Sequence, residues 1–176
     1  MWSRTVLGTV LICFAIAAPS ADDLPKEWRF ATTEELDLDA GGVSRIDSPN
    51  RFTRAEADFN GDGTGDIAYC LKSTIHNGEG LIVKLSDGPG YQWLVLEEFK
   101  WGQGYSNVDL GMGVDVAQPG RMETACGKGY WECEKGDLAE LALANPGILY
   151  FKLESASSVF HWDSTKSEFV RVWISD

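Results

Sequence analysis

The chain has 176 residues, of which 44% are hydrophobic and 24% are charged, and its formal net charge is −12 at pH 7. So acidic a balance argues against binding to nucleic acid or to anionic membrane surfaces, and it favours cations or a basic protein as partners. The length is sufficient for one domain with a substantial hydrophobic core.

The opening segment, MWSRTVLGTVLICFAIAAPSA (residues 1–21), combines one basic residue, an apolar run and a small-residue exit. This pattern is typical of a secretory signal peptide, and the apolar run is too short for a membrane span. We therefore expect a periplasmic or secreted protein in which residues 22–176 form a single domain. Removal of the signal peptide would take away Arg4 and leave a charge of −13.

The predicted elements after this segment are one short helix and then strands. Thr32 followed by Glu35 is a capping-box pattern, which predicts a helix over TTEELD. Apolar and alternating runs predict strands at 67–71, 81–85 and 91–96, and three more in GILYFKLE, SVFHWD and FVRVWIS. Turn signals separate them, among them Asn77-Gly78 and Asp87-Gly88-Pro89-Gly90. We expect a mainly β, single antiparallel domain: a twisted sheet, a sandwich or a partial barrel.

The most distinctive segment is AEADFNGDGTGDIAYCL, in which oxygen-bearing side chains recur at every second position. Like charges so close together repel one another unless a cation lies among them, and hard oxygen ligands at this spacing suit Ca²⁺. Gly63 stands at the sixth position, where an EF-hand loop turns sharply. A metal-free Asn/Asp/Gly turn is the alternative. The predicted ligands are Asp58, Asn60, Asp62, Thr64 (through its backbone carbonyl) and Asp66.

The segment is not an EF-hand, because Tyr69 stands where the bidentate glutamate would be and a strand follows Asp66. The pattern D-x-N-x-D-G-x-x-D leading into a strand resembles the calcium loops of FG-GAP and VCBS-type repeats. That resemblance covers little more than the loop, and it implies that Asp66 is the bidentate ligand and that calcium stabilises the fold. CGKGYWECEKGD and ESASSVFHWDSTKSEFVRVWISD look like segments of small exported bacterial proteins with one such loop. A single loop without internal repeats does not make a propeller.

The cysteines predict one disulfide. Cys126 and Cys133 bracket GKGYWE, a short glycine-containing loop that can close without strain in an oxidising compartment. The bridge would contribute about 2.5 kcal/mol on the loop-entropy model. Cys70 lies in the apolar strand after the acidic loop and is expected to be buried and inert. A catalytic cysteine would need a basic neighbour, and only Lys72 is close in sequence.

No common nucleophile, Walker or zinc-protease motif occurs in the sequence. His76 falls in a turn, and His161 shares a strand face with Asp163, which favours a hydrogen-bonded surface residue over a general base. Glu97 and Glu98 should lie on opposite faces of their strand. We therefore predict no catalytic residues and no enzymatic activity, although the fold could still bring a carboxylate pair together.

Two glycine-rich segments with aromatic residues are candidate binding surfaces, KWGQGYSNVDLGMGVDV (100–116) and GKGYWECEKGD (127–137). Aromatic anchors on a mobile backbone suit partner recognition, but plain connections between strands would have the same composition. Most of the strand-associated tryptophans are expected in the core: Trp93, Trp101, Trp131, Trp162 and Trp173.

These features predict an exported calcium-binding protein that acts as a non-catalytic protein-binding module, in concrete form an inhibitor or immunity protein against a basic toxin or hydrolase. Neither nucleic acid binding nor membrane insertion is expected. The first alternative is a carbohydrate-binding or hydrolytic envelope protein that uses aromatics such as Trp101 and Tyr105. The second is a structural envelope protein whose only ligand is calcium.

Overall fold

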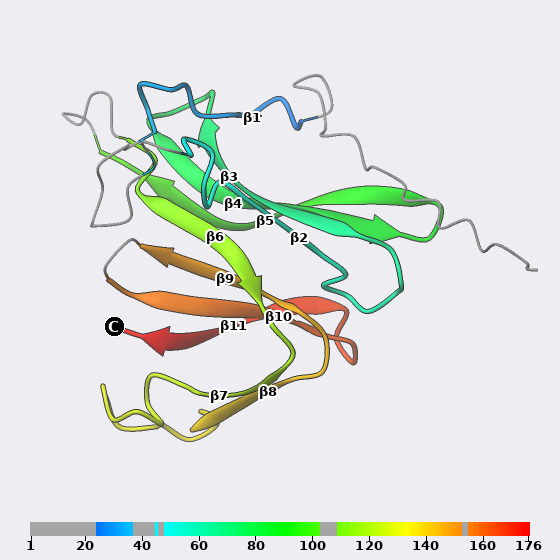
Figure 1. The fold of residues 1–176 in the computed structure, drawn as a ribbon, viewed down its shortest axis with the longest axis vertical. Coiled ribbons are helices and arrows are strands. Elements are labelled where there is room, and N and C mark those ends of the chain that lie inside the picture. The colour runs from blue at the N-terminus through cyan, green and yellow to red at the C-terminus, as the bar shows by residue number, and fades with distance from the viewer. Residues whose placement is uncertain (1–23, 37–44, 46–47, 103–108, 153–154) are drawn as a thin grey trace, which may run out of the picture.

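The computed structural model describes residues 24–36, 45, 48–102, 109–152 and 155–176 (Figure 1). In these residues the chain forms eleven strands and no helix. The predicted signal peptide (1–21) and Tyr105 lie outside the described residues. In chain order the strands are β1 (Trp28–Arg29), β2 (Arg54–Ala57), β3 (Asp66–Ser73), β4 (Gly78–Asp87), β5 (Gly90–Lys100), β6 (Met112–Ala117), β7 (Gly120–Glu123), β8 (Glu140–Leu143), β9 (Gly147–Lys152), β10 (Ser157–Asp163) and β11 (Glu168–Ser175).

The larger sheet has the strand order β1-β3-β4-β5, and β2 pairs with β3 on the same edge as β1. Every pairing is antiparallel. A register shift between Leu81 and Ile82 gives β5 one extra residue against β4. Such a bulge bends the strand and increases its twist.

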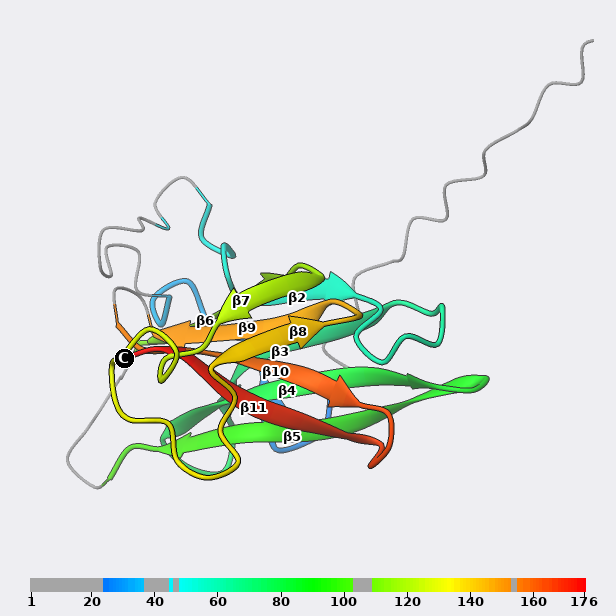
Figure 2. The ribbon, with the colours of Figure 1, turned by 90° about the horizontal axis from the view of Figure 1, so that it is seen from below.

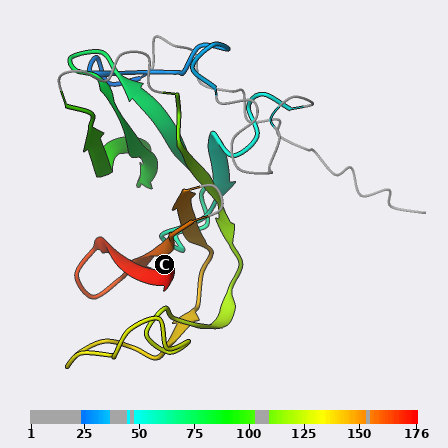
Figure 3. The same ribbon diagram turned by 90° about the vertical axis from the view of Figure 1, so that its left-hand side faces the viewer.

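A second antiparallel sheet has the order β11-β10-β9-β6, and β7 and β8 form a separate two-stranded ribbon. Figures 1 and 2 show the larger sheet on one side, the second sheet beneath it, and the ribbon on the outer side of the second sheet. Figure 3 shows that β6 runs from the upper sheet down to the ribbon. The Val114 N–H of β6 donates to the Phe52 carbonyl just before β2, at 2.8 Å, and so links the two sheets.

The two main sheets share one hydrophobic core. Alternate residues of β3 and β4, such as Cys70 and Leu81, meet Ile148 of β9 and Phe160 of β10 there. The intervening residues of β3 and β4 pack with Trp28 in a second cluster on the other face. Both faces of these strands are therefore covered, which explains why their sequences are almost continuously apolar.

The hairpins predicted from the turn residues are confirmed. β3 and β4 pair across the turn that contains Asn77-Gly78, and β4 and β5 pair across Asp87–Gly90. The three C-terminal strand predictions correspond to β9, β10 and β11. The expected mainly β, antiparallel class is correct. The core between the two main sheets joins strands that are distant in sequence.

The predicted N-terminal helix is wrong, although its capping box forms. The Thr32 N–H donates to the Glu35 carboxylate at 2.9 Å, and the Glu35 N–H lies 3.4 Å from the Thr32 hydroxyl. Residues 32–36 form a turn and no helix, and Asp37 lies outside the described residues. The Glu35 carbonyl instead accepts the Leu110 N–H at 2.6 Å. Leu36 is meanwhile buried in the core between the sheets. Tertiary contacts thus take over the groups that a helix would use.

The expectation that most of the strand-associated tryptophans are core residues is also wrong. Trp93, Trp101 and Trp162 are half-buried, and Trp131 and Trp173 are each 40% exposed. These residues lie on the edges and ends of the sheets and in the disulfide loop. The tryptophan that is buried is Trp28, on the outer face of the larger sheet.

The core predicts a strong contrast between two leucines. Leu81→Ala, at a site with no exposure, should lower the free energy of unfolding by about 2–5 kcal/mol through lost burial and the cavity left behind. Leu138→Ala, at a site 55% exposed, should change it by less than about 0.5 kcal/mol. Denaturant unfolding measures both, and similar losses would contradict the assignment of the core.

Candidate functional site

The acidic loop connects β2 to β3 at the ends of these strands. Gly61 and Gly63 have φ of 78° and 86°, a conformation that disfavours other residues. Phe59 is fully buried in the core and anchors the start of the loop. A Cβ atom added at Gly61 would lie 2.3 Å from the Asn145 side chain, so the loop packs closely against the turn before β9.

The loop curls around the carboxylates of Asp58 and Asp62. Asp58 accepts the N–H groups of Gly61, Asp62 and Gly63, at 2.7–3.0 Å. Asp62 accepts the Thr64 N–H at 2.7 Å, and its other oxygen lies 2.9 Å from the Ser86 hydroxyl. These contacts, that of the Thr64 N–H foremost, hold the pKa of Asp62 below its usual range.

Asp66 is the buried member of the set. One carboxylate oxygen accepts the N–H groups of Phe59 and Asn60, at 2.7 and 3.3 Å. The other accepts the N–H and the hydroxyl of Ser86, both at 2.7 Å. Four donors fill the acceptor capacity of a carboxylate. A bidentate role for Asp66 therefore requires that it exchange some of these bonds for the ion.

The loop has the oxygen ligands that calcium prefers, but these oxygens are not yet gathered around one point. The Ser86 hydroxyl has one proton, which the shorter contact assigns to Asp66, so Asp58 accepts three donors and Asp62 accepts two, and both keep acceptor positions for an ion. The carbonyl of Thr64 and the amide oxygen of Asn60 complete a set of hard oxygens. Over the described part of the chain, however, His, Cys, Asp and Glu form no group of three that could hold a metal ion. Binding would need a small inward movement of the carboxylates.

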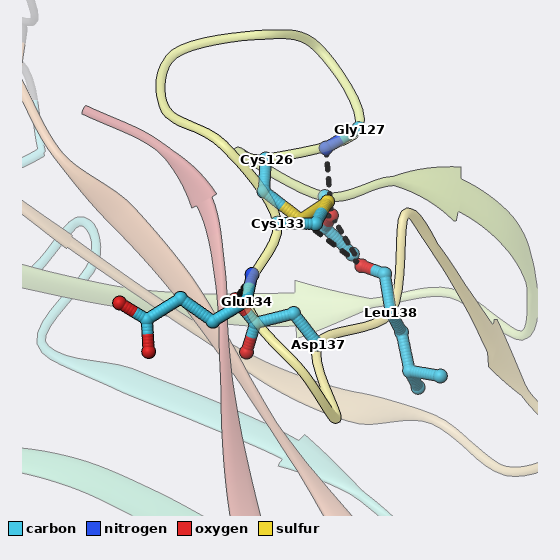
Figure 4. The surroundings of a disulfide bond; sticks show 7 residues. Cys126, Gly127, Cys133, Glu134, Asp137 and Leu138 are labelled. Atoms are coloured by element: carbon cyan, nitrogen blue, oxygen red, sulfur yellow. Dashed lines mark hydrogen bonds between the residues drawn. A yellow bond between two sulfur atoms is a disulfide. The ribbon is translucent and has the colours of Figure 1, made fainter.

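The predicted disulfide is confirmed: Cys126 and Cys133 are bridged, with their Cα atoms 5.0 Å apart (Figure 4). The base of the loop is tied down, because the Thr124 hydroxyl donates to the Leu138 carbonyl at 2.6 Å and accepts the Gly127 N–H at 3.1 Å. The Ala125 N–H also donates to the Trp173 carbonyl of β11. Every residue from 127 to 140 is nevertheless exposed. We call residues 126–138 the disulfide loop.

A groove of about 280 Å³ separates the disulfide loop from the strands β10 and β11. Trp131 and Leu138 line it from the loop, and His161 and Trp173 line it from the strands. Tyr130, which is 54% exposed, stands beside Trp131 in the sequence. The aromatic side chains of this loop, Tyr130 and Trp131, are therefore exposed at the surface.

A second cavity, of about 310 Å³, opens where the two main sheets end. Its inner residues include Glu79 of β4 and Tyr150 of β9, each only 1% exposed. This cavity was not predicted from the sequence. The signal was that Glu79 has the same strand parity as Leu81 and Val83, which points its carboxylate toward the core.

The other acidic side chains of this region are paired. Glu97 contacts Arg171 across the two sheets at 2.7 Å, whereas Glu98 lies 3.2 Å from both His76 and Lys100. The two glutamates thus serve opposite faces, as predicted. Cys70 is buried and unbridged, also as predicted, and burial raises the pKa of its thiol.

Comparisons with known proteins found no family model, no curated protein and no solved structure that matches this chain. The described residues contain no helix that is long and apolar enough to cross a bilayer.

The buried carboxyl of Glu79 predicts a pH-dependent stability. Burial raises its pKa from 4.5 to about 7, against the opposing charges of Lys72 and Arg45. Since the folded state holds this proton more tightly, the group stabilises the protein at low pH. That contribution, about 3 kcal/mol, is lost as the pH rises from about 4.5 to about 7. Glu79→Gln should therefore be more stable than the wild type above about pH 7 and equal to it near pH 4.

Denaturant unfolding across this pH range tests the prediction. Glu123→Gln, at an exposed site on β7, is the matched control and should show no such trend. A difference between Glu79→Gln and wild type that does not vary with pH would contradict the assignment.

Proposed function

We propose that this chain is an exported, calcium-binding protein that works as a non-catalytic protein-binding module, most concretely an inhibitor or immunity protein. The observation that supports this proposal best is the disulfide loop, which is exposed at every position from 127 to 140 yet fastened at its base. A loop of this kind fits into the cleft of a partner.

The loop has the features of an interface hot spot. Tyr130, Trp131 and Leu138 are 54%, 40% and 55% exposed. Aromatic anchors of this type supply most of the energy in many interfaces. The bridge and the Thr124 hydrogen bonds restrict the loop before binding, which lowers the entropy lost on association. The groove beside Trp131 can receive a side chain of the partner.

The charge of the chain indicates what kind of partner it would meet. At −12, the protein attracts basic molecules and accelerates their association at low salt. A basic toxin or hydrolase fits this surface. The disulfide agrees with an oxidising compartment such as the periplasm or the extracellular space.

Calcium in this proposal stabilises the fold. Asp58, Asn60, Asp62 and the Thr64 carbonyl would hold the ion, and Asp66 would join them or continue to fasten the loop to β4. In both cases the ion would neutralise the charge of the loop and stabilise the native state.

A carbohydrate-binding role is the alternative, and one observation favours it. Trp131 and Trp173 line the same groove as His161 and Asp137. Aromatic faces beside polar groups are a suitable surface for a sugar. Competition separates the two roles, because a soluble oligosaccharide would compete for a sugar site and would not displace a protein from the interface.

The loop variants give the first test. Tyr130→Ala and Trp131→Ala should each abolish capture of a stoichiometric protein from envelope extract, while Tyr91→Ala should capture it as the wild type does. Tyr91 is a suitable control because it is 49% exposed on the β4–β5 hairpin, away from the disulfide loop. Capture by Trp131→Ala at the wild-type level would exclude the loop as the interface.

The metal gives the second test. Asp62→Ala should lower the thermal stability much more in calcium than with chelator, where only the exposed hydrogen bonds of this carboxylate are lost. A site filled at about 100 times its Kd would contribute about 2.7 kcal/mol. Asp87→Ala, at an exposed acidic residue where β4 ends, is the control. Equal effects of Asp62→Ala with calcium and with chelator, in thermal melts, would exclude the metal.

A further inference from the structure

The cavity between the ends of the two main sheets has the features of a small-molecule site. It lies where β4 begins and where β5, β9 and β11 end, at the end of the sheets that carries the C-terminus (Figure 1). Its volume of about 310 Å³ falls at the lower end of the range for ligand sites. Cavities of roughly 150 Å³ are large enough for benzene, so this one has room for two fused rings.

The walls are mostly apolar, and four of the ten lining residues are aromatic. Phe99 of β5 and Trp101, just after this strand, stack with ring centroids 6.3 Å apart and planes 19° apart. Trp173 of the second sheet lines the same cavity. Flat apolar molecules gain both burial and ring–ring contacts from such walls.

Arg171 fixes the position of the Trp173 wall. Its guanidinium lies 4.0 Å from the Trp173 ring centroid and donates to Glu97 at 2.7 Å and to the Ser158 hydroxyl at 3.0 Å. The cation is therefore already paired, so it does not select for an anionic ligand. The wall is held in place before any ligand enters.

Two buried polar atoms at the inner end have no hydrogen-bond partner among the residues that the structure describes. They are Oε1 of Glu79 and the hydroxyl of Tyr150. The other oxygen of Glu79 accepts the Gly111 N–H at 3.1 Å. An unpaired buried polar atom is costly, so each of the two would gain from a hydrogen-bond partner, which a ligand in this cavity can supply. The carboxylate oxygen accepts a hydrogen bond, and the phenol can donate or accept one.

The charges near the inner end favour a neutral ligand. Lys72 faces Glu79 across β3 and β4, and Arg45 is fully buried nearby, as their electrostatic effects on Glu79 show. An added cation would meet these two positive groups, and an added anion would meet Glu79. Lys152 also lines the cavity, but it is exposed, so its charge is hydrated and does not act at the inner end. Either charge would also lose its hydration in an apolar cavity.

We propose that this cavity binds a neutral aromatic molecule of about two rings that carries a hydroxyl or N–H donor. The rings lie against Phe99, Trp101 and Trp173, and the donor reaches Glu79 and Tyr150. This binding activity is separate from the protein interface proposed for the disulfide loop.

Three probes that share one ring system test the proposal: β-naphthol, naphthalene and β-naphthoate. Titrated into the whole mature chain at neutral pH and followed by tryptophan fluorescence, β-naphthol should bind saturably at one molecule per chain. Its affinity should exceed that of naphthalene, which lacks the donor, and that of β-naphthoate, which is an anion, by about tenfold each. Failure of β-naphthol to saturate, or equal affinity for naphthalene, would overturn the proposal.

Variants place the probe in the molecule. Trp173→Ala, at a 40% exposed site, should weaken β-naphthol about tenfold, and Tyr150→Phe should reduce its advantage over naphthalene. Tyr91→Ala should bind like the wild type. Because Trp173 also lines the groove beside the disulfide loop, Trp131→Ala is needed as well. It should leave β-naphthol binding unchanged, and loss of binding in this variant would move the probe to the groove and overturn the proposal.

Discussion

The carboxylate of Asp66 joins the acidic loop to the central strands. It is the first residue of β3, it has no exposure, and it gathers donors from the loop on one oxygen and from Ser86 near the end of β4 on the other. A buried charge is tolerated only with such complete hydrogen bonding. The β3–β4 pairing and the path of the loop are thus fixed by one side chain.

The central position of β3 and β4 extends this constraint to the whole molecule. Their inward residues form the core with the second sheet, and their outward residues bury Trp28. The acidic loop lies at the beginning of β3, and the cavity with Glu79 lies beyond its other end. Along β3, Asp66 and Lys72, the partner of Glu79, are about 20 Å apart. The proposed calcium site at one end and the proposed ligand and protein sites at the other can therefore be occupied independently.

The elements that could be predicted from the sequence are those decided by local chemistry. Asn77-Gly78 and Asp87–Gly90 favour tight turns whatever the rest of the chain does, and the confirmed bridge closes a loop of seven residues' separation. The failures came where distant residues intervene. Leu110 takes the carbonyl that a helix after Thr32 would have used, and the edges of two sheets leave Trp173 exposed. The cavity could not be predicted, because Glu79, Tyr150 and Trp173 meet only through the packing of the two sheets.

The burial of Cys70 has a consequence for how the chain acquires its bridge. The described residues include three cysteines, so in the unfolded chain Cys70 can pair with Cys126 or Cys133 in place of the native bridge. The seven-residue separation of the native pair favours their encounter. Once β3 is packed in the core, the Cys70 side chain is buried and burial raises the pKa of its thiol. Thiol–disulfide exchange requires a thiolate, so this thiol is unreactive in the folded protein. Among the described residues, folding therefore withdraws the one free thiol that could exchange with the finished bridge.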